Sequence, residues 1–315
     1  MTLDKNHPVR AVAIQDYRAF IASVNDAVIA SLPRPKDLQR MGSTLEGTVL
    51  HGRIEAYVPY FIVMDVLNYQ FWDIDADGSF VRYGHNGAVG AMAMQAAMRQ
   101  LWETALDGAL GQGLTLRAQV ERVVNALRSR IEAEGVGFVL GDIPSAESRR
   151  VLLLEALDVE KLVAISEFLV ARVKGTGELG WADAQMLAYL FPQCYADRYL
   201  KKAQLTLMFI AGESCAWDVP CRLNVTAAAD YQLPKVLRSL NILSYSADLA
   251  ESIRTRRRIK KDSVEEKAIR AATIIACDRL AEHFGVTIEE IDFWLWVNRN
   301  VDREALFHLT ETTDY

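Results

Sequence analysis

Two carboxylates in apolar surroundings are the residues of this chain whose types and spacing could do chemistry. Asp230 lies in the segment AADYQLP, between small residues and a tyrosine, and Asp292 lies in the string IDFWLW. Burial of either carboxylate without a partner would cost several kcal/mol, so we expect a ligand or a polar partner to meet each of them. Carboxylates among aromatic rings are typical of sites that stabilise a cationic transition state, as glycoside cleavage requires, or that hold a cationic ring-shaped ligand.

Each acid also has a purely structural explanation. Asp230 precedes Leu233 and Pro234, and an aspartate in that position commonly caps the start of a helix. Asp292 could be one half of a buried ion pair with an arginine such as Arg270. The residues alone leave both explanations open beside catalysis.

The common catalytic and metal-binding signatures are absent from the sequence. It has no Walker loop, no GxGxxG after a strand, no HExxH and no GxSxG, and its five histidines are scattered. The four cysteines form no C-x-x-C pair and have no histidines at zinc-ligand spacing. They are Cys194, Cys215, Cys221 and Cys277. We therefore expect reduced structural thiols, no metal and no organic cofactor.

The composition is that of an ordinary globular protein. Of 315 residues, 51% are hydrophobic and 24% are charged, which suits one large domain or two smaller ones. The net charge of −6 argues against a surface built mainly for duplex nucleic acid, although a local basic patch could contact a phosphate. The N-terminus lacks an apolar signal core, and the weakly polar run at 88–98 is too short to span a bilayer. We expect a cytoplasmic protein with no membrane partner.

Helical patterns dominate the elements that must position the two acids. An amphipathic pattern predicts a helix over 10–32 that stops at Pro33. Ser263 with Glu266 and Thr287 with Glu290 match the S/T-x-x-E capping box at two later helix starts. Further helices are expected at 88–107, 115–134, 145–174, 181–190, 197–211, 263–283 and 288–299, with Gly285 as a stop between the last two. We predict a mainly α single domain over residues 1–315, for which the architecture of helical DNA glycosylases is one form.

A small β-hairpin is the exception to this helical pattern. The run 57–72 is apolar on nearly every side and is compatible with a buried helix or strand. After it, DIDADGSFVRYG has a DG turn between apolar residues and predicts a hairpin. Asp73, Asp75, Asp77 and Gly78 also match the first half of a calcium loop. Its closing glutamate would fall on Gly84, however, so a plain turn is favoured.

Several motifs occur in an order that matches a known family. They are DVLNYQFW at 65–72, VRY at 81–83, YLKKAQL at 199–205, ADYQLPKVLRSLNILSYSADL at 229–249, IDFWLW at 291–296 and FHLT from 307. With them the sequence resembles the queuosine 5′-phosphate N-glycosylase/hydrolases, also called queuosine salvage proteins. The resemblance covers nearly the whole chain. It departs from the family pattern at Ala228, Gln232 and Val301, where Phe, Arg and an acid are usual, and Asp302 is adjacent to the last of these.

The resemblance implies hydrolysis of the bond that joins queuine to ribose 5-phosphate, with release of the base for salvage into tRNA modification. Positive charge develops on the sugar as this bond breaks, and a fixed carboxylate stabilises it electrostatically or as a covalent adduct. Asp230 is the candidate for that role. Because a 7-deazapurine has carbon in place of N7, the leaving base cannot be protonated there, and the demand on Asp230 rises.

The resemblance also implies a set of substrate-binding residues. Asp292 would accept hydrogen bonds from the base or from its cationic aminomethyl arm. Trp296 is four residues further along the same helical face and offers a stacking surface, whereas Trp294 points towards the core. Lys201 and Lys202 are candidates for the 5′-phosphate, although lysines are usually just solvated. The remaining candidates are His51, which aligns with a ligand-binding histidine of the family once a gap is allowed, and Ala228 and Tyr231 beside Asp230.

Two rival functions stay open at this point. One is a protein that binds queuine-like bases without cleaving them, given the altered flanks of Asp230. The other is a DNA or RNA base glycosylase, which would need a basic face and an extruding wedge. The basic run from Arg254 to Lys261 lacks interleaved aromatics and is interpreted as a solvated connector. We therefore expect a small-molecule nucleotide substrate and no nucleic-acid partner, while the oligomeric state stays open.

Overall fold

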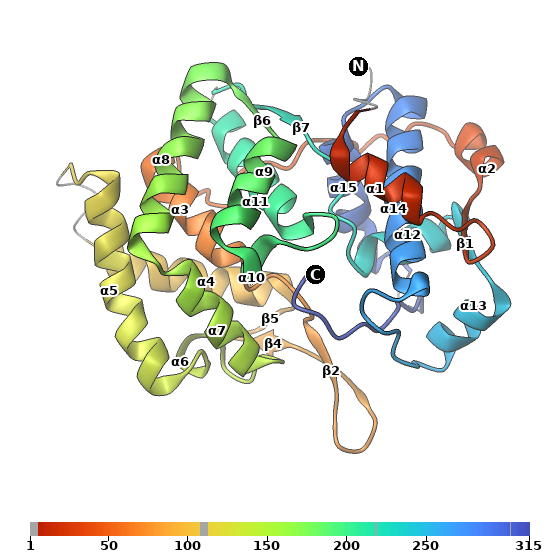
Figure 1. Cartoon of the computed structure of the whole chain (residues 1–315), viewed down its shortest axis with the longest axis horizontal. Coiled ribbons are helices and arrows are strands. Elements are labelled where there is room, and N and C mark those ends of the chain that lie inside the picture. Colours follow the sequence, from red (N-terminus) through yellow and green to blue (C-terminus); the bar gives the residue numbers. More distant parts are fainter. Residues whose placement is uncertain (1–5, 108–112, 218, 303) are drawn as a thin grey trace.

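The computed structural model describes residues 6–107, 113–217, 219–302 and 304–315, and helices make up most of them (Figure 1). Strands occur as short pairs, so the prediction of a mainly α fold is confirmed. Two large groups of buried apolar residues lie side by side. We call them the first core, which is built on α3, α5, α8 and α11, and the second core, which is built on α12, α14 and α15.

The first core surrounds α3 (Ile54–Asp65), on the left of Figure 1. Every residue from Ala56 to Asp65 is buried, which explains why this run is apolar on all sides. Helix α3 packs against α8 (Val159–Thr176) and α11 (Lys201–Cys215). The other helices of this half are α4 (Ala91–Leu106), α5 (Leu116–Glu134), α6 (Gly137–Leu140), α7 (Ala146–Ala156), α9 (Trp181–Leu190) and α10 (Pro192–Tyr195).

The second core surrounds α14 (Val264–Phe284), on the right of Figure 1. It packs against α1 (Pro8–Asp16), α12 (Gln232–Ser239) and α15 (Ile288–Val297). Gly285 ends α14 with a positive φ of 66°, and the Glu290 carboxylate accepts a hydrogen bond from the Thr287 amide at the start of α15. The remaining helical segments are α2 (Asp26–Ser31), α13 (Ala247–Arg254) and a 3₁₀ turn at Asn298–Asn300.

The strands are short and paired two by two. The predicted hairpin is present as β2 (Trp72–Ile74) against β3 (Phe80–Arg82), and Asp75 accepts hydrogen bonds from the amides of its turn. The other pairs are β1 (Ala22–Val24) with β8 (Leu243–Tyr245), β4 (Gly84–His85) with β5 (Ala88–Val89), and the parallel pair β6 (Glu178–Gly180) with β7 (Arg222–Asn224). Among the described helices, none is both long and apolar enough to cross a membrane.

Three of the predicted helices are wrong in their bounds. The pattern at 10–32 is broken by β1, because Ala22–Val24 pairs with a strand more than two hundred residues away and Asn25 then caps α2. The pattern at 145–174 is two helices, since the Asp158 side chain accepts the Lys161 amide and starts α8. The helix predicted at 197–211 starts at Lys201 instead, where the Asp197 carboxylate accepts its amide.

Candidate active site

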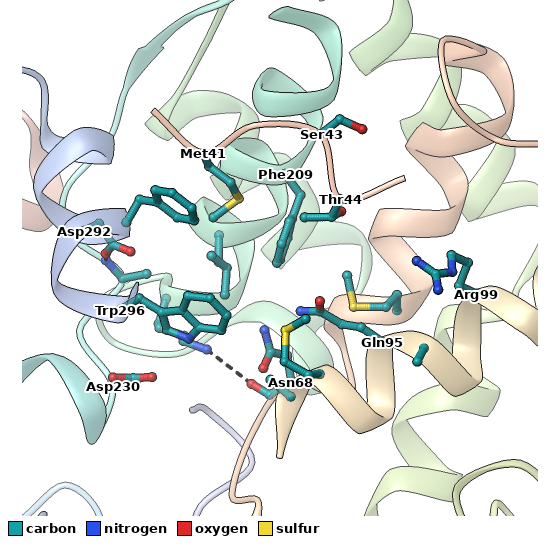
Figure 2. A pocket seen from close by; sticks show the side chains of 18 of the residues that line it. Met41, Ser43, Thr44, Asn68, Gln95, Arg99, Phe209, Asp230, Asp292 and Trp296 are labelled. Carbon is teal, nitrogen blue, oxygen red and sulfur yellow. Dashed lines mark hydrogen bonds between the residues drawn. The ribbon is translucent and has the colours of Figure 1, made fainter. Parts of the chain in front are cut away.

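A cavity of about 370 Å³ lies between the first and the second core. Met64 and Phe209 reach it from the first core, whereas Asp230, Asp292 and Trp296 reach it from the segments around α12 and α15. Figure 2 shows the two acids on the Trp296 side of the cavity and Arg99 on the far side. The cavity therefore brings together two residues that are 62 positions apart and that sequence alone marked as reactive.

The segment that precedes Asp230 is built from small residues because it passes through a crowded place. Ala227, Ala228 and Ala229 are all buried, and they pack into three different apolar clusters. The side chain of Ala228 also lines the cavity. The small side chain at this position leaves space next to Asp230 and Asp292.

Asp230 caps a helix and faces the cavity at the same time. Its Oδ1 accepts the amide of Gln232 at 2.6 Å and that of Leu233 at 3.1 Å, at the first residues of α12. Within the described part of the chain, both hydrogen bonds to Asp230 end on Oδ1, so Oδ2 is left for the cavity that the residue lines. The structural and the chemical explanation of this residue are thus compatible, and the cap fixes the carboxylate in place.

Asp292 is buried, and the alternative that it forms an ion pair with Arg270 is wrong, because Arg270 pairs with Asp197 and Glu266. Its Oδ2 accepts the backbone amide of Ala228 at 2.7 Å. Burial, aided by the charge of Asp230, raises the pKa of Asp292 to about 7 against the lowering effects of the Ala228 amide and Lys201. Asp292 therefore exchanges its proton near neutral pH, where it can either accept or donate a hydrogen bond.

Trp296 lines the cavity together with Asp292, as their spacing on one helical face predicts. The Arg299 guanidinium carbon lies 3.7 Å from the centre of the Trp296 ring, which holds the indole in place by a cation–π contact. Trp294 instead packs against the second core, as predicted. The indole of Trp296 is thus available to a planar ligand.

The two adjacent lysines lie in different places. Lys201 lines the cavity, and its Nζ donates to the Asn68 carbonyl at 3.2 Å, which is the dashed bond in Figure 2. Lys202 is fully buried, donates to the Val66 carbonyl at 3.1 Å and does not line the cavity. Burial lowers the pKa of Lys202 to about 8. Neither lysine is solvated, and only Lys201 is placed to meet a ligand.

His51 lies outside the cavity lining. Its Nδ1 is 2.7 Å from Oε1 of Glu213, and Ser43, which does line the cavity, donates to the same carboxylate. The His51 ring also meets the Trp217 ring edge-on, with centroids 4.9 Å apart. His51 therefore holds the loop that carries Ser43 and does not itself face the space next to Asp230.

A second, smaller cavity of about 110 Å³ adjoins the first. Lys201, Asp230 and Trp296 line both cavities. Tyr231 lines the smaller one, where its hydroxyl accepts the Phe71 amide at 3.5 Å. Arg82 and Arg299 also line the smaller cavity, and the sequence analysis did not predict either of them as a site residue. The sequence pointed to Arg82 only through the VRY motif that contains it, and it did not point to Arg299.

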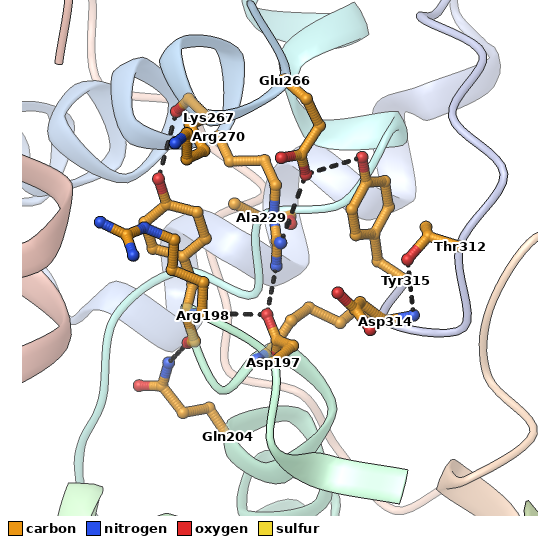
Figure 3. A network of polar contacts seen from close by, with 12 residues as sticks. Asp197, Arg198, Gln204, Ala229, Glu266, Lys267, Arg270, Thr312, Asp314 and Tyr315 are labelled. Carbon is orange, nitrogen blue, oxygen red and sulfur yellow. Dashed lines mark hydrogen bonds and ion pairs between the residues drawn. The ribbon is translucent and has the colours of Figure 1, made fainter. Parts of the chain in front are cut away.

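A buried charged cluster supports the opposite side of the Ala228–Asp230 segment (Figure 3). Arg270 donates to the Ala229 carbonyl at 3.1 Å and pairs with Asp197 at 2.6 Å. It also pairs with Glu266, which accepts a further bond from the Tyr315 hydroxyl at 3.0 Å. Ser263 caps α14 as predicted, but Glu266 is used in this cluster and does not complete the capping box. The cluster thus ties the backbone next to Asp230 to α14.

No metal site is visible in the described residues, since no group of three or more His, Cys, Asp or Glu side chains could hold an ion. Asp73, Asp75 and Asp77 in the β2–β3 hairpin form no such group. The four cysteines are free, and three of them are buried. Carboxylates, cations and aromatic rings line the two cavities.

Comparison with known proteins finds three relatives that share the same name. A family model described as queuosine salvage protein matches residues 210–314, which contain both Asp230 and Asp292. A queuosine 5′-phosphate N-glycosylase/hydrolase of Sphaerobacter thermophilus is 27% identical over 261 residues, covering 77% of this chain and 76% of the relative. The mouse protein of that name is 25% identical over 303 residues, covering 84% and 83%, and the Dictyostelium discoideum protein is 32% identical over 77 residues, covering 23% and 24%. These matches confirm the resemblance to the queuosine salvage proteins that the sequence motifs indicate.

Proposed function

We propose that this protein hydrolyses the N-glycosidic bond of queuosine 5′-phosphate, or of a closely related 7-deazapurine nucleotide or nucleoside, and releases queuine for salvage into tRNA modification. The observation that carries this proposal is the placement of Asp230 and Asp292 on one cavity beside Trp296. The names of the relatives agree with this chemistry.

Asp230 stabilises the sugar as the base departs. When the bond from C1′ to the base breaks, the electron pair leaves with the base, and the sugar carries positive charge. A carboxylate that is held by two backbone amides needs no rearrangement to meet that charge, which makes its stabilisation effective. Water then adds to C1′ and loses a proton, and the base gains one, so that queuine and ribose 5-phosphate result.

Asp292 and Trp296 hold the base. The ionised form of Asp292 accepts a hydrogen bond from the base or from its cationic arm, and the Ala228 amide orients the carboxyl. The Trp296 ring provides a stacking face next to it. Ala228 and Tyr231 complete the surroundings of Asp230, and Lys201 supplies positive charge at the junction of the two cavities.

We further propose that residues 1–315 act as one domain in the cytoplasm. The cavity takes its walls from both the first and the second core, so neither half would form the site alone. Free cysteines are typical of proteins in a reducing compartment. The net charge of −6 supports a small-molecule substrate and no nucleic-acid partner.

The test is incubation of the purified protein with queuosine 5′-phosphate under single-turnover conditions, with free base and ribose 5-phosphate measured by mass spectrometry. We expect both products in equal amounts. Binding of the nucleotide without release of either product would establish a carrier of queuine-like bases instead. Base release from duplex DNA or RNA, with steeply salt-dependent binding, would establish a nucleic-acid glycosylase.

A further inference from the structure

Arg149 is a fully buried arginine that has no acidic partner among the described residues. It lies on α7 and is 0% exposed. Arg270 is buried to a similar extent, but it pairs with Asp197 and Glu266. Burial lowers the pKa of Arg149 to about 10, so its guanidinium still carries its charge at neutral pH. A buried charge without an opposite charge is costly unless hydrogen bonds compensate it, so the groups that Arg149 contacts indicate its role.

The guanidinium of Arg149 binds backbone carbonyls instead of a carboxylate. Its Nη2 donates to the Tyr69 carbonyl and, at 3.2 Å, to the Gln70 carbonyl, and its Nη1 donates to the Pro144 carbonyl. Its guanidinium carbon lies 3.9 Å from the centre of the Tyr69 ring and 5.5 Å from that of the Phe71 ring. A planar guanidinium has several donors in a fixed arrangement, so one side chain holds both the backbone and the rings of one loop. We call residues 68–71, which follow α3, the 68–71 loop.

The 68–71 loop has a backbone conformation that needs such support. Gln70 has a φ of 31°, in the region that residues other than glycine rarely adopt. Its amide donates to the Tyr315 carbonyl at 3.1 Å, and the Asn68 carbonyl accepts a hydrogen bond from the Lys201 ammonium at 3.2 Å. Arg149 binds the two carbonyls that lie between Asn68 and the end of the loop. Loss of Arg149 would remove the donor from both carbonyls, and the loop would relax from its present shape.

The 68–71 loop forms a wall that the two cavities share. Asn68 lines both cavities, and Tyr69 and Phe71 line the smaller one. The Phe71 amide also donates to the hydroxyl of Tyr231, the residue after Asp230, at 3.5 Å. The arginine behind the loop lines neither cavity. A movement of the loop would therefore displace groups around Asp230 although the arginine itself touches no ligand.

We propose that Arg149 is a positioning residue that holds the 68–71 loop in its reactive shape before a substrate binds. The loop in turn fixes Lys201 and Tyr231 beside Asp230. The kinetic consequence rests on the proposed function. Because Arg149 lines neither cavity, its loss leaves the contacts to the ligand in place but misaligns the groups around the reacting bond. The turnover number kcat should therefore fall much more than KM changes.

The experiment measures kcat and KM for hydrolysis of queuosine 5′-phosphate by the wild type, Arg149→Met and Arg149→Lys. We expect Arg149→Met to lower kcat about 30-fold and to change KM less than about threefold. Arg149→Lys keeps the charge and a donor, so it should recover part of this loss and lower kcat only about fivefold.

Lys202→Met is the matched control. Lys202 is also a buried cation, and it donates to the Val66 carbonyl, two residues before the 68–71 loop. Its replacement should change kcat less than about twofold. An effect on KM alone in the Arg149 variants, or no effect on either constant in the folded protein, would show a merely structural role and overturn the proposal.

Hydrogen–deuterium exchange followed by mass spectrometry separates this proposal from the proposed function, because it needs no substrate. We expect amide exchange in residues 66–72 to be about tenfold faster in Arg149→Met than in the wild type, and exchange in α14 to be unchanged. If Arg149→Met does not fold, Arg149→Lys carries the same comparison. If the wild type releases no base, the proposed function fails, yet faster exchange confined to residues 66–72 would still support the positioning role. Exchange that is unchanged in these residues, or faster throughout the chain, would overturn it.

Discussion

The two sides of the Ala228–Asp230 segment differ in how their charges are compensated. On one side, Arg270 meets Asp197, Glu266 and the Ala229 carbonyl within hydrogen-bond distance. On the other side, Asp230 and Asp292 accept backbone amides and form no salt bridge within the described residues. Opposite charges are thus paired where the fold needs a fixed backbone, and charges are left unpaired where a ligand is proposed to bind.

The pKa values on the two sides reflect the same difference. Burial alone would lower the pKa of Arg270, but Asp197 and Glu266 raise it above its usual value, so its charge is permanent. Burial, aided by the charge of Asp230, raises the pKa of Asp292 to about 7, and Lys201 offsets this rise only in part. The charge of Arg270 is therefore insensitive to pH changes near neutrality, whereas the charge of Asp292 is sensitive to them.

The largest expected effect comes from breaking the paired side. Arg270→Met removes the cation and leaves Asp197 and Glu266 buried with like charges, which should lower the free energy of unfolding by about 3–5 kcal/mol. Urea denaturation measures this loss. The exposed pair of Arg117 and Glu160 is the control, and Arg117→Met should lower the free energy of unfolding far less, because solvent screens that pair. A loss below 1 kcal/mol in Arg270→Met would contradict the role given to the paired side.

Next in size is the removal of charge from the cavity side at Asp230. Asp230→Asn keeps an oxygen that can accept the amides of Gln232 and Leu233, so we expect normal stability with kcat lowered by about 10²- to 10³-fold. Asp230→Ala removes the cap as well and should also lose about 1 kcal/mol of stability. Single-turnover kinetics and thermal unfolding of both variants separate the two roles. Full activity in Asp230→Asn would contradict the mechanism.

Asp292→Asn tests the sensitivity of the cavity side to pH. Because the folded pKa of Asp292 is about 7 and its usual value is 3.8, the folded protein binds more protons than the unfolded chain between these values. This acid therefore makes the wild type lose stability as pH rises from about 4 to 7, by up to a few kcal/mol. Asp292→Asn should be more stable than the wild type at pH 8 and similar at pH 4. Parallel stability–pH curves from thermal unfolding would disprove the assignment.

Asp292→Asn should lower the activity of the protein at the same high pH at which it raises the stability. The ionised carboxylate is the form that binds the cationic arm, so kcat/KM of the wild type should rise with pH through about 7. Asp292→Asn should lose about tenfold in kcat/KM at pH 8, because a charged hydrogen bond is lost. The pH profile of nucleotide hydrolysis measures both. A wild-type profile that falls through pH 7 would mean that the protonated acid is the active form.

Local signals in the sequence were sufficient for part of the fold. Helix α9 begins and ends where the pattern predicts, and Thr287 with Glu290 forms the expected capping box, because each signal lies within a few residues. The pattern at 10–32 fails because β1 pairs with β8, and this contact lies outside any local window. Helix ends that depend on local capping and periodicity can thus be predicted from the sequence. The interruption of a helix by a strand that pairs with a distant segment cannot.

The residues of the candidate site also differ in whether the sequence alone identifies them. Asp230 and Asp292 stood out because an acid in an apolar string needs a partner, and both line the cavity. Arg82 and Arg299 gave no such signal, since Arg82 lies in a predicted hairpin and Arg299 in a polar segment, and an arginine is ordinary in both. Their common cavity arises only when β3 and the turn after α15 are packed together. Sequence therefore identifies reactive groups that are costly to bury, but not those whose role depends on tertiary placement.

Lys201 and Lys202 are expected to differ in their effect on activity. Adjacent residues on a helix point about 100° apart, and only the packing of the helix decides which of them faces the cavity. The sequence alone therefore could not distinguish the two lysines. Lys201→Met should lower kcat/KM for the nucleotide about tenfold, because it removes a cation from both cavities. Lys202→Met should change kcat/KM less than about twofold, since Lys202 contacts Val66 and Tyr69 and not the cavity.

Lys202 should be visible in stability instead of activity. Its folded pKa of about 8 lies below the usual 10.5, so between these values the folded protein binds fewer protons than the unfolded chain, and stability rises with pH across that window. Lys202→Met should flatten this rise, as measured by thermal unfolding from pH 7 to 10, while Lys201→Met should retain it. A loss of nucleotide hydrolysis in Lys202→Met as large as that in Lys201→Met would contradict this assignment. Lys202 would then act on the substrate as well as on the stability of the fold.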